Sequence, residues 1–478
     1  MGPRLAAALV LVTSAAVLVL EILVVRLVAP YVGLTLETYT AAIGVALAAI
    51  AAGAALGGRL ADRSDPRRWL GPATAVGGAL VLVARPTVLA LGDGFRGTGP
   101  VGTLMLVTLA VGPAAAVLSA VPPGVVKLRL RTLDETGQTV GRLSALGTLG
   151  ALAGTFLTGF VLLSALPTSR LLLGTGLLLV LGGLALSVRD RRAAGLAGAA
   201  AVAAAALLAV PSPCDAETRY YCAQVRTDPD RDSGRLLVLD GLSHSYVDLA
   251  DPAHLEFGYT QRIGDVLAAQ PPGALDVLHL GLGAGTVPRH LAEVRPGSTS
   301  TVLEVDPVLV DLGRDELGLP ADVDVVVGDA RTSVADQPSA AYDVVVGDAF
   351  GSLAVPWHLT TAEMVAEVRR VLRPGGTYVL NVIDHPPLAF ARAEAATLLA
   401  AFAHVAVYAT ADAVSGEEGG NLVLVASDAP LPAALEQAAR DRGEVLREAS
   451  GFASDAPVLT DDDAPVDQLL TPYPARRS

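Results

Sequence analysis

Seven long apolar stretches in the first 212 residues constrain the fold of this chain more than any other feature. They lie at 5–29, 38–58, 69–91, 101–122, 143–163, 170–188 and 193–211. A helix needs about 20 residues to cross the hydrocarbon of a bilayer, so each stretch is a candidate span. The first is too long for the apolar core of a signal peptide and contains Glu21 and Arg26, so we interpret it as a retained helix. The sequence therefore predicts a multi-pass protein of the cell membrane.

Charge divides the chain at the end of the last apolar stretch. Residues 1–212 hold 16 of the 34 Lys and Arg residues and 8 of the 48 Asp and Glu residues, a net of +8, so residues 213–478 carry −22. An acidic surface repels the phosphates of nucleic acids. We expect a helical membrane domain at 1–212, a water-soluble domain at 213–478 and no nucleic-acid partner.

Three clusters of basic residues lie between alternate spans, and the rule that positive loops stay inside assigns them to the cytoplasm. They comprise Arg59, Arg63, Arg67 and Arg68; Lys127, Arg129, Arg131 and Arg142; and Arg189, Arg191 and Arg192. With a seventh span at 193–211, the second half of the chain would emerge outside. Because that stretch is mostly alanine and inserts weakly, the side of the membrane stays open at this point.

The two cysteines of the chain, Cys214 and Cys222, follow the last apolar stretch. A close pair at this position suits a disulfide in an oxidising compartment, and two separate thiols are the alternative. No third cysteine and no neighbouring histidine pair can complete a thiolate site, so we expect no metal.

From residue 235 the pattern changes to short β-rich runs separated by amphipathic helices. Runs at 235–240 and 245–249, joined through a glycine, predict a β-hairpin at the start of the domain. Further strands are expected at 275–281, 300–304, 323–327, 342–347 and 376–382, with helices at 286–295, 307–316 and 361–372. Such alternation is typical of a doubly wound parallel sheet, so the second half is expected to be α/β and Rossmann-like.

The run Gly281-Leu-Gly-Ala-Gly285 follows the first of these strands and opens a helix. Glycines let the chain turn sharply and let a ligand approach the helix N-terminus, which makes candidate binding residues of Gly281, Gly283 and Gly285. Glu304 ends the next strand, 19 residues after Gly285, where a carboxylate accepts the hydroxyls of a ribose. Thr286 stands where a dinucleotide fingerprint has its third glycine, so the pattern favours a sulfonium nucleoside over NAD.

Two more acidic residues follow the next two strands. Asp329 comes after the strand at 323–327, where a carboxylate can accept a hydrogen bond from an adenine amino group. Asp348 comes after the strand at 342–347, at the mouth of the sheet where reacting groups lie. Because the carboxyl ends of parallel strands share one edge, the glycine loop and these acids are expected at one site.

In the order and spacing of these motifs, residues 217–385 resemble the spermidine synthase (polyamine aminopropyltransferase) family, in the branch with N-terminal transmembrane helices. The resemblance is carried by segments 237–241, 256–259, 281–285, 304–307 and 342–348. It implies a Rossmann-like domain of the class I methyltransferase type, preceded by a β-hairpin. It also implies transfer of an aminopropyl group from decarboxylated S-adenosylmethionine to a small-molecule amine, with the lipid bilayer and a second copy of the chain as further partners.

The resemblance assigns a role to each candidate residue. Glu304 would hold the ribose, Asp329 the adenine, and Asp348 would take a proton from the attacking amine. Tyr259 would line the substrate pocket. His244 stands where the family has a hairpin glutamine, and it is either a cofactor-binding residue of the pocket or a histidine whose hydrogen bonds are satisfied within the hairpin. We expect His358 to anchor a loop.

Two departures leave other functions open. Ala284 and Gly351 stand where the family has aspartates, which lowers the negative charge expected around a polyamine; Glu256 and Asp384 are candidates to replace it. A methyltransferase that uses S-adenosylmethionine needs no aspartate at position 284. A non-catalytic nucleoside-binding membrane protein and, on its helices alone, a transporter are the remaining alternatives.

Overall fold

The computed structural model describes residues 1–33, 36–96, 98–130, 132, 136–188, 191–208, 214–350 and 355–471. The chain divides into two compact units, Met1–Ser212 and Pro213–Arg476, which are described separately below. Arg131, Arg189 and Gly351, singled out above, lie outside the described residues.

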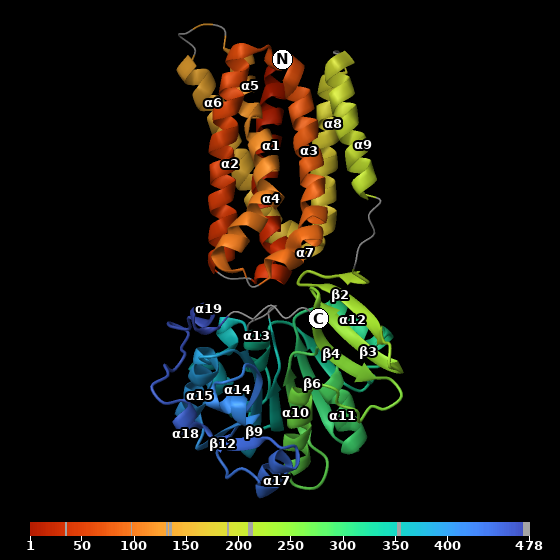
Figure 1. The fold of residues 1–478 in the computed structure, drawn as a ribbon, viewed down its shortest axis with the longest axis vertical. Coiled ribbons are helices and arrows are strands. Elements are labelled where there is room, and N and C mark those ends of the chain that lie inside the picture. The colour runs from red at the N-terminus through yellow and green to blue at the C-terminus, as the bar shows by residue number, and fades with distance from the viewer. Residues whose placement is uncertain are drawn as a thin grey trace. The chain divides into compact units, whose positions relative to one another are not determined.

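The first unit is a bundle of antiparallel helices (Figure 1). Its long helices are α1 (Pro3–Val32), α2 (Leu36–Arg63), α3 (Pro66–Leu91), α4 (Gly99–Ser119), α6 (Thr136–Phe156), α8 (Thr168–Ser187) and α9 (Arg191–Leu208). Shorter segments are η1 (Gly92–Phe95), α5 (Val121–Arg129), the π-helical η2 (Leu157–Leu162) and α7 (Leu163–Ala165). Six described segments are long and apolar enough to cross a membrane: Pro3–Val32, Leu36–Arg63, Pro66–Phe95, Gly99–Arg129, Thr136–Leu162 and Thr168–Ser187. The seventh expected span corresponds to α9, whose side chains are described only in part.

Glycines allow these helices to approach closely. A Cβ atom at Gly53 of α2 would collide with the carbonyl oxygen of Ala116 in α4, and one at Gly150 of α6 would collide with the backbone of Leu11 in α1. Close approach of this kind maximises packing where no hydrophobic effect drives helices together.

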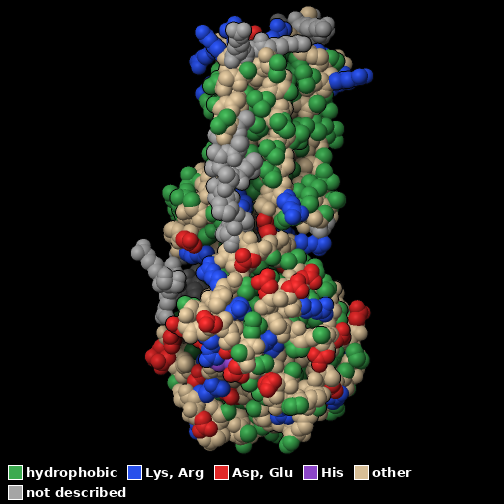
Figure 2. Space-filling model, turned by 90° about the vertical axis from the view of Figure 1, so that its right-hand side faces the viewer, with side chains coloured by type: hydrophobic (Ala, Val, Ile, Leu, Met, Phe, Trp, Pro, Cys, Tyr) green, Lys and Arg blue, Asp and Glu red, His purple; other side chains and the backbone are tan. Residues whose placement is uncertain are grey.

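The basic clusters lie at one end of the bundle. The α2–α3, α5–α6 and α8–α9 connections share the end that holds the N-terminus, and α9 runs from that end toward the opposite one (Figure 1). Figure 2 shows Lys and Arg side chains gathered at that first end and a largely apolar surface along the helices. An apolar belt below a positively charged end is the arrangement expected of a membrane domain.

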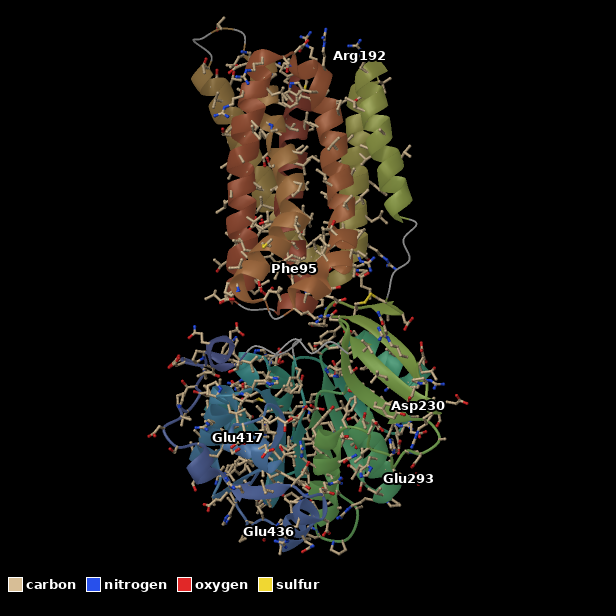
Figure 3. The ribbon with its side chains drawn as sticks, viewed as in Figure 1. Phe95, Arg192, Asp230, Glu293, Glu417 and Glu436 are labelled. Carbon is tan, nitrogen blue, oxygen red and sulfur yellow. A yellow bond between two sulfur atoms is a disulfide. The ribbon has the colours of Figure 1, made fainter. Side chains whose placement is uncertain are left out.

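The second unit begins with a four-stranded antiparallel sheet in the order β1 (Ala216–Glu217), β2 (Cys222–Asp228), β3 (Arg231–Leu239) and β4 (Leu242–Asp248). The predicted hairpin is confirmed as β3–β4, and two further strands extend it. A disulfide joins Cys214 to Cys222 at the start of β2 (Figure 3). This bond closes a short loop next to the sheet.

The main sheet has eight strands in the order β12-β10-β11-β9-β8-β5-β6-β7. The strands are β5 (Asp276–Leu280), β6 (Thr299–Glu304), β7 (Asp324–Val327), β8 (Tyr342–Gly347), β9 (Leu372–Asp384), β10 (His404–Ala409), β11 (Gly420–Ser427) and β12 (Val445–Glu448). The five predicted strands, β5 to β9, are parallel, as expected. The last three are antiparallel, so the sheet is mixed. Ten residues, 410–419, separate β10 from β11, too few for a parallel crossover, which takes about a dozen or more.

Helices cover both faces of this sheet. On one face α10 (Gly258–Ala269), α11 (Thr286–Val294) and α17 (Ala433–Asp441) pack on Val277, Val344 and Val379. On the other face α14 (Ala362–Val371) and α15 (Ala389–Ala401) pack on Val345 and Tyr378. The remaining elements are α12 (Pro307–Asp315), α13 (Ala330–Ala335), η3 (Trp357–Leu359), α16 (Ala411–Ser415), α18 (Ala449–Phe452) and α19 (Val466–Leu469). Burial on both faces explains why the central strands are nearly continuous runs of valine and leucine.

Candidate active site

The loop after β5 needs its glycines because the backbone takes positive φ angles. The values are 94° at Gly281, 54° at Gly283 and 74° at Gly285. Gly281 packs against the backbone after Asp348, and a Cβ at Gly283 would crowd Ser245. Gly285 instead packs against Leu319 and begins α11, so its place is structural.

Glu304 ends β6 and is held by backbone amides. Its Oε2 accepts a hydrogen bond from the Leu282 N–H at 2.8 Å, and its Oε1 accepts one from the Asp306 N–H at 2.9 Å. The side chain is 6% exposed. Burial raises the pKa of Glu304 above its ordinary value, and the amide hydrogen bonds act in the opposite direction. Each carboxylate oxygen keeps a lone pair for a ligand hydroxyl.

A cavity of about 220 Å³ opens at the carboxyl edge of the sheet. Six of the predicted site residues line it: His244, Gly281, Gly283, Glu304, Asp329 and Asp348. Burial lowers the pKa of His244 to about 4, so its imidazole is neutral at pH 7. The structure thus brings these six residues together at one cavity, whereas Gly285 lies outside its wall.

Asp348 lies at the centre of a buried polar network. Its Oδ1 accepts a hydrogen bond from Asn381 Nδ2 at 2.8 Å, and Asn381 Oδ1 accepts one from Asn421 Nδ2 at 3.0 Å. The Tyr259 hydroxyl also hydrogen-bonds to Asp348. Burial raises the pKa of Asp348 to about 6, against the opposing effect of the Asn381 and Tyr259 hydrogen bonds. A carboxylate with this pKa is suited to accept a proton near neutral pH.

Tyr259 stays protonated in this network. Burial and the neighbouring Asp348 raise the pKa of its hydroxyl well above the ordinary value. The hydroxyl lies 3.5 Å from the carbonyl oxygen of His244, so α10 and the β4 hairpin meet at this point. Tyr259 is therefore a hydrogen-bond donor beside Asp348.

Asp329 begins α13 and faces a histidine. One carboxylate oxygen accepts the Arg331 N–H at 2.8 Å, and the other lies 3.2 Å from His358 Nε2. His358 lines the same cavity, in addition to its place in the short helix η3. The sequence suggested only a loop anchor for this histidine.

Three residues of the site were not predicted. Tyr220 and Tyr221 line the cavity from the disulfide loop, and the Tyr221 hydroxyl donates to the Phe350 carbonyl oxygen at 2.7 Å. Asn381 supports Asp348 from the middle of β9. Two sequence features could have indicated these residues: an aromatic pair between the two cysteines, and a single amide side chain in a strand of buried apolar residues.

Parts of the chain are similar to known proteins. A protein-family model described as a methyltransferase domain matches residues 277–376. A probable polyamine aminopropyl transferase of Bifidobacterium longum is 31% identical over 171 residues, which cover 35% of this chain and 36% of that protein. The chain thus spans about a third of the length of that relative.

A second relative matches more of the chain. A polyamine aminopropyltransferase of Mycobacterium tuberculosis is 29% identical over 379 residues, covering 71% of this chain and 70% of its own. Residues 213–478 are 266 of 478, about 56%, so this alignment extends into the helical unit. By sequence, the chain is similar to polyamine aminopropyltransferases.

A solved structure is also similar to part of the chain. A probable spermidine synthase from Corynebacterium glutamicum is 31% identical, with a TM-score of 0.49, and the match covers 53% of this chain and 97% of that one.

Proposed function

We propose that this chain is a membrane-anchored aminopropyltransferase that transfers an aminopropyl group from decarboxylated S-adenosylmethionine to an amine. One observation carries the proposal: the part-buried carboxylate of Asp348, whose pKa is raised to about 6, lines the cavity of about 220 Å³ at the carboxyl edge of the sheet. The residues present fit the nucleoside. Gly283 leaves room for it, and Glu304 offers acceptors at the end of β6.

The roles of the side chains follow from their chemistry. Decarboxylated S-adenosylmethionine supplies a methylene carbon activated by the adjacent sulfonium. Glu304 accepts the ribose hydroxyls, and Asp329 accepts from the adenine amino group. Asp348 holds the amine and removes its proton, which frees the nitrogen lone pair to form the new C–N bond as the C–S bond breaks. Tyr259 and Asn381 keep the Asp348 carboxylate aimed at that nitrogen.

The experiment is calorimetric titration of the full chain in detergent, combined with product analysis. We expect binding of methylthioadenosine and decarboxylated S-adenosylmethionine, and release of methylthioadenosine when an amine is added. A folded protein that binds neither compound would overturn the proposal.

A methyltransferase is the second candidate. The match of a methyltransferase-domain model to residues 277–376 favours it, as does Ala284, which is fully buried. The two activities leave different products. Release of S-adenosylhomocysteine from S-adenosylmethionine, without release of methylthioadenosine from the decarboxylated compound, would select the methyltransferase.

We further propose that the soluble domain faces the outside of the membrane. The basic connections lie at the end of the bundle opposite to the end of α9, and the rule that positive loops stay inside makes that basic end cytoplasmic. The Cys214–Cys222 disulfide immediately follows, and such bonds persist in oxidising compartments. Arg96, at the other end, pairs with Asp93 and adds little net charge there.

Labelling of intact cells tests this orientation. The chain has two cysteines, so a membrane-impermeant maleimide reports on Cys214 and Cys222 alone. We expect labelling only after an impermeant reductant has been added. In a cysteine-free variant, Ser64→Cys places a thiol in the exposed α2–α3 connection and must stay protected. Protection of the native pair after reduction would instead locate the domain in the cytoplasm.

A further inference from the structure

Asp348 borders two cavities. The larger one is the cavity described above, which we propose holds the nucleoside, and the second is a small space of about 20 Å³ between α10 and the start of α11. Gly281 and Asp348 line both of them. The polar side chains around the small cavity are Ser245, Tyr259, Thr260, His279, Thr286 and Asp348. Asp348 therefore stands where a nucleophile would meet the nucleoside.

Few carboxylates near Asp348 are available to a cationic acceptor. Among the described residues that line the small cavity, Asp348 alone carries a carboxylate, and burial lowers the pKa of His279 to about 3, so that imidazole is neutral. In the larger cavity, Glu304 is bound by two backbone amides and Asp329 faces His358. One carboxylate is thus available to a cationic acceptor.

The two acids that the sequence offered as replacements are used elsewhere. Asp384 accepts hydrogen bonds from the backbone N–H groups of His385, Ala391 and Thr471, and it is fully buried. Glu256 lies 2.9 Å from His254 Nε2, at the surface. Neither lines either cavity.

The two positions at which the family has aspartates do not supply a second carboxylate either. Ala284 belongs to an apolar cluster with Leu237 and Leu309. Residues 351–354 read Gly-Ser-Leu-Ala, so their sequence adds no acid after Asp348. Among the described residues, Asp348 is thus the one carboxylate that the small cavity offers to a cationic amine.

We propose that the acceptor is an amine with a single cationic nitrogen, and not a diamine or polyamine. The inference rests on the proposed aminopropyl transfer. The donor already brings an ammonium group and a sulfonium, so a diamine would leave a second ammonium of its own without a carboxylate. A buried cation without a partner is strongly disfavoured. A space of about 20 Å³ beside Asp348 holds roughly one water-sized group, such as the amino group of the acceptor.

Matched amine pairs test the inference. Rates of methylthioadenosine release by the full chain are compared for n-propylamine against 1,3-diaminopropane and for n-butylamine against putrescine. We expect kcat/KM to be at least about tenfold higher for each monoamine, because 1.4 kcal/mol of lost binding is already tenfold. Equal or greater kcat/KM for the diamines would overturn the inference and leave the proposed transfer intact. Binding of methylthioadenosine with turnover of no amine would overturn both.

A charge-addition variant gives a second readout. Ser245→Asp places a carboxylate on the wall of the small cavity, whereas Ser243→Asp places one on the exposed side of the same strand. We expect the first to move selectivity toward putrescine by about tenfold and the second to leave it unchanged. A folded Ser245→Asp variant with wild-type selectivity would contradict the charge argument. The comparison of monoamines with diamines on the wild-type chain tests the inference even if neither variant folds.

Discussion

Replacement of Asp348 by Asn should lower kcat by about 10²- to 10⁴-fold, the usual contribution of a general base. The Asn side chain has the same shape and can still accept the hydrogen bond from Asn381, which now reaches Asp348 at 2.8 Å. It cannot remove a proton from an amine. Binding of methylthioadenosine should therefore survive while transfer is lost.

Steady-state kinetics and calorimetry on the same preparation measure both effects. Asp343→Asn is the matched control, because Asp343 lies on β8, the strand that Asp348 follows, but pairs with Arg373 away from the cavity. We expect the control to retain wild-type kcat. An Asp348→Asn variant with more than about a tenth of wild-type kcat would exclude Asp348 as the base.

The pH dependence of kcat/KM gives a further test of Asp348 as the base. Because burial raises the pKa of Asp348 to about 6, the carboxyl is protonated below that pH and cannot accept a proton. Wild-type kcat/KM should therefore fall as the pH drops through about 6, and the inflection should be absent in Asp348→Asn. An unchanged inflection in the variant would assign it to another group.

The main elements of the fold were readable from the sequence where the pattern was long or clearly alternating. The apolar stretches and the β5 to β9 strands belong to this class. Strand β10, His-Val-Ala-Val-Tyr-Ala, was missed, because it follows the alanine-rich α15 and a short apolar run does not distinguish a buried strand from a helix. Strand β2 was missed for a different reason: its mixed polar composition, Cys-Ala-Gln-Val-Arg-Thr-Asp, shows no continuous apolar face.

The candidate site was predictable where function coincides with a strand end. Glu304 and Asp348 follow their strands directly, and parallel topology alone brings them to one edge. Asn381 could not be assigned in this way, because its partner depends on the β8–β9 register, which pairs Gly347 with Leu380. A shift of one residue would turn the amide to the other face of the sheet.

Tyr221 illustrates a second limit. Its hydroxyl reaches the Phe350 carbonyl oxygen across 129 residues of sequence, and no local pattern encodes such a contact. The Cys214–Cys222 disulfide restrains the loop that carries it. The wall of the nucleoside cavity therefore depends on a covalent bond that forms only in an oxidising compartment, which agrees with the proposed outward orientation.

Replacement of Glu304 by Gln should weaken methylthioadenosine binding by at least about 100-fold. Both carboxylate oxygens accept backbone N–H groups, from Leu282 at 2.8 Å and from Asp306 at 2.9 Å. In glutamine, an NH₂ group replaces one of the two oxygens, and this group cannot accept a hydrogen bond from a backbone N–H. One hydrogen bond is therefore lost, and the glycine loop shifts. Each hydrogen bond to a charged group contributes about 1.5–3 kcal/mol, and about 2.7 kcal/mol corresponds to 100-fold.

Calorimetric titration of the Glu304→Gln chain, with thermal unfolding to verify that it is folded, measures this loss. Glu293→Gln on α11 is the matched control, since Glu293 is exposed and lies on the outer side of the soluble unit (Figure 3). Its affinity should equal that of the wild type. If the folded Glu304→Gln variant binds within about threefold of the wild type, Glu304 supports the loop without contacting the ribose, because loss of a charge-assisted contact would cost more than the roughly 0.6 kcal/mol that threefold represents.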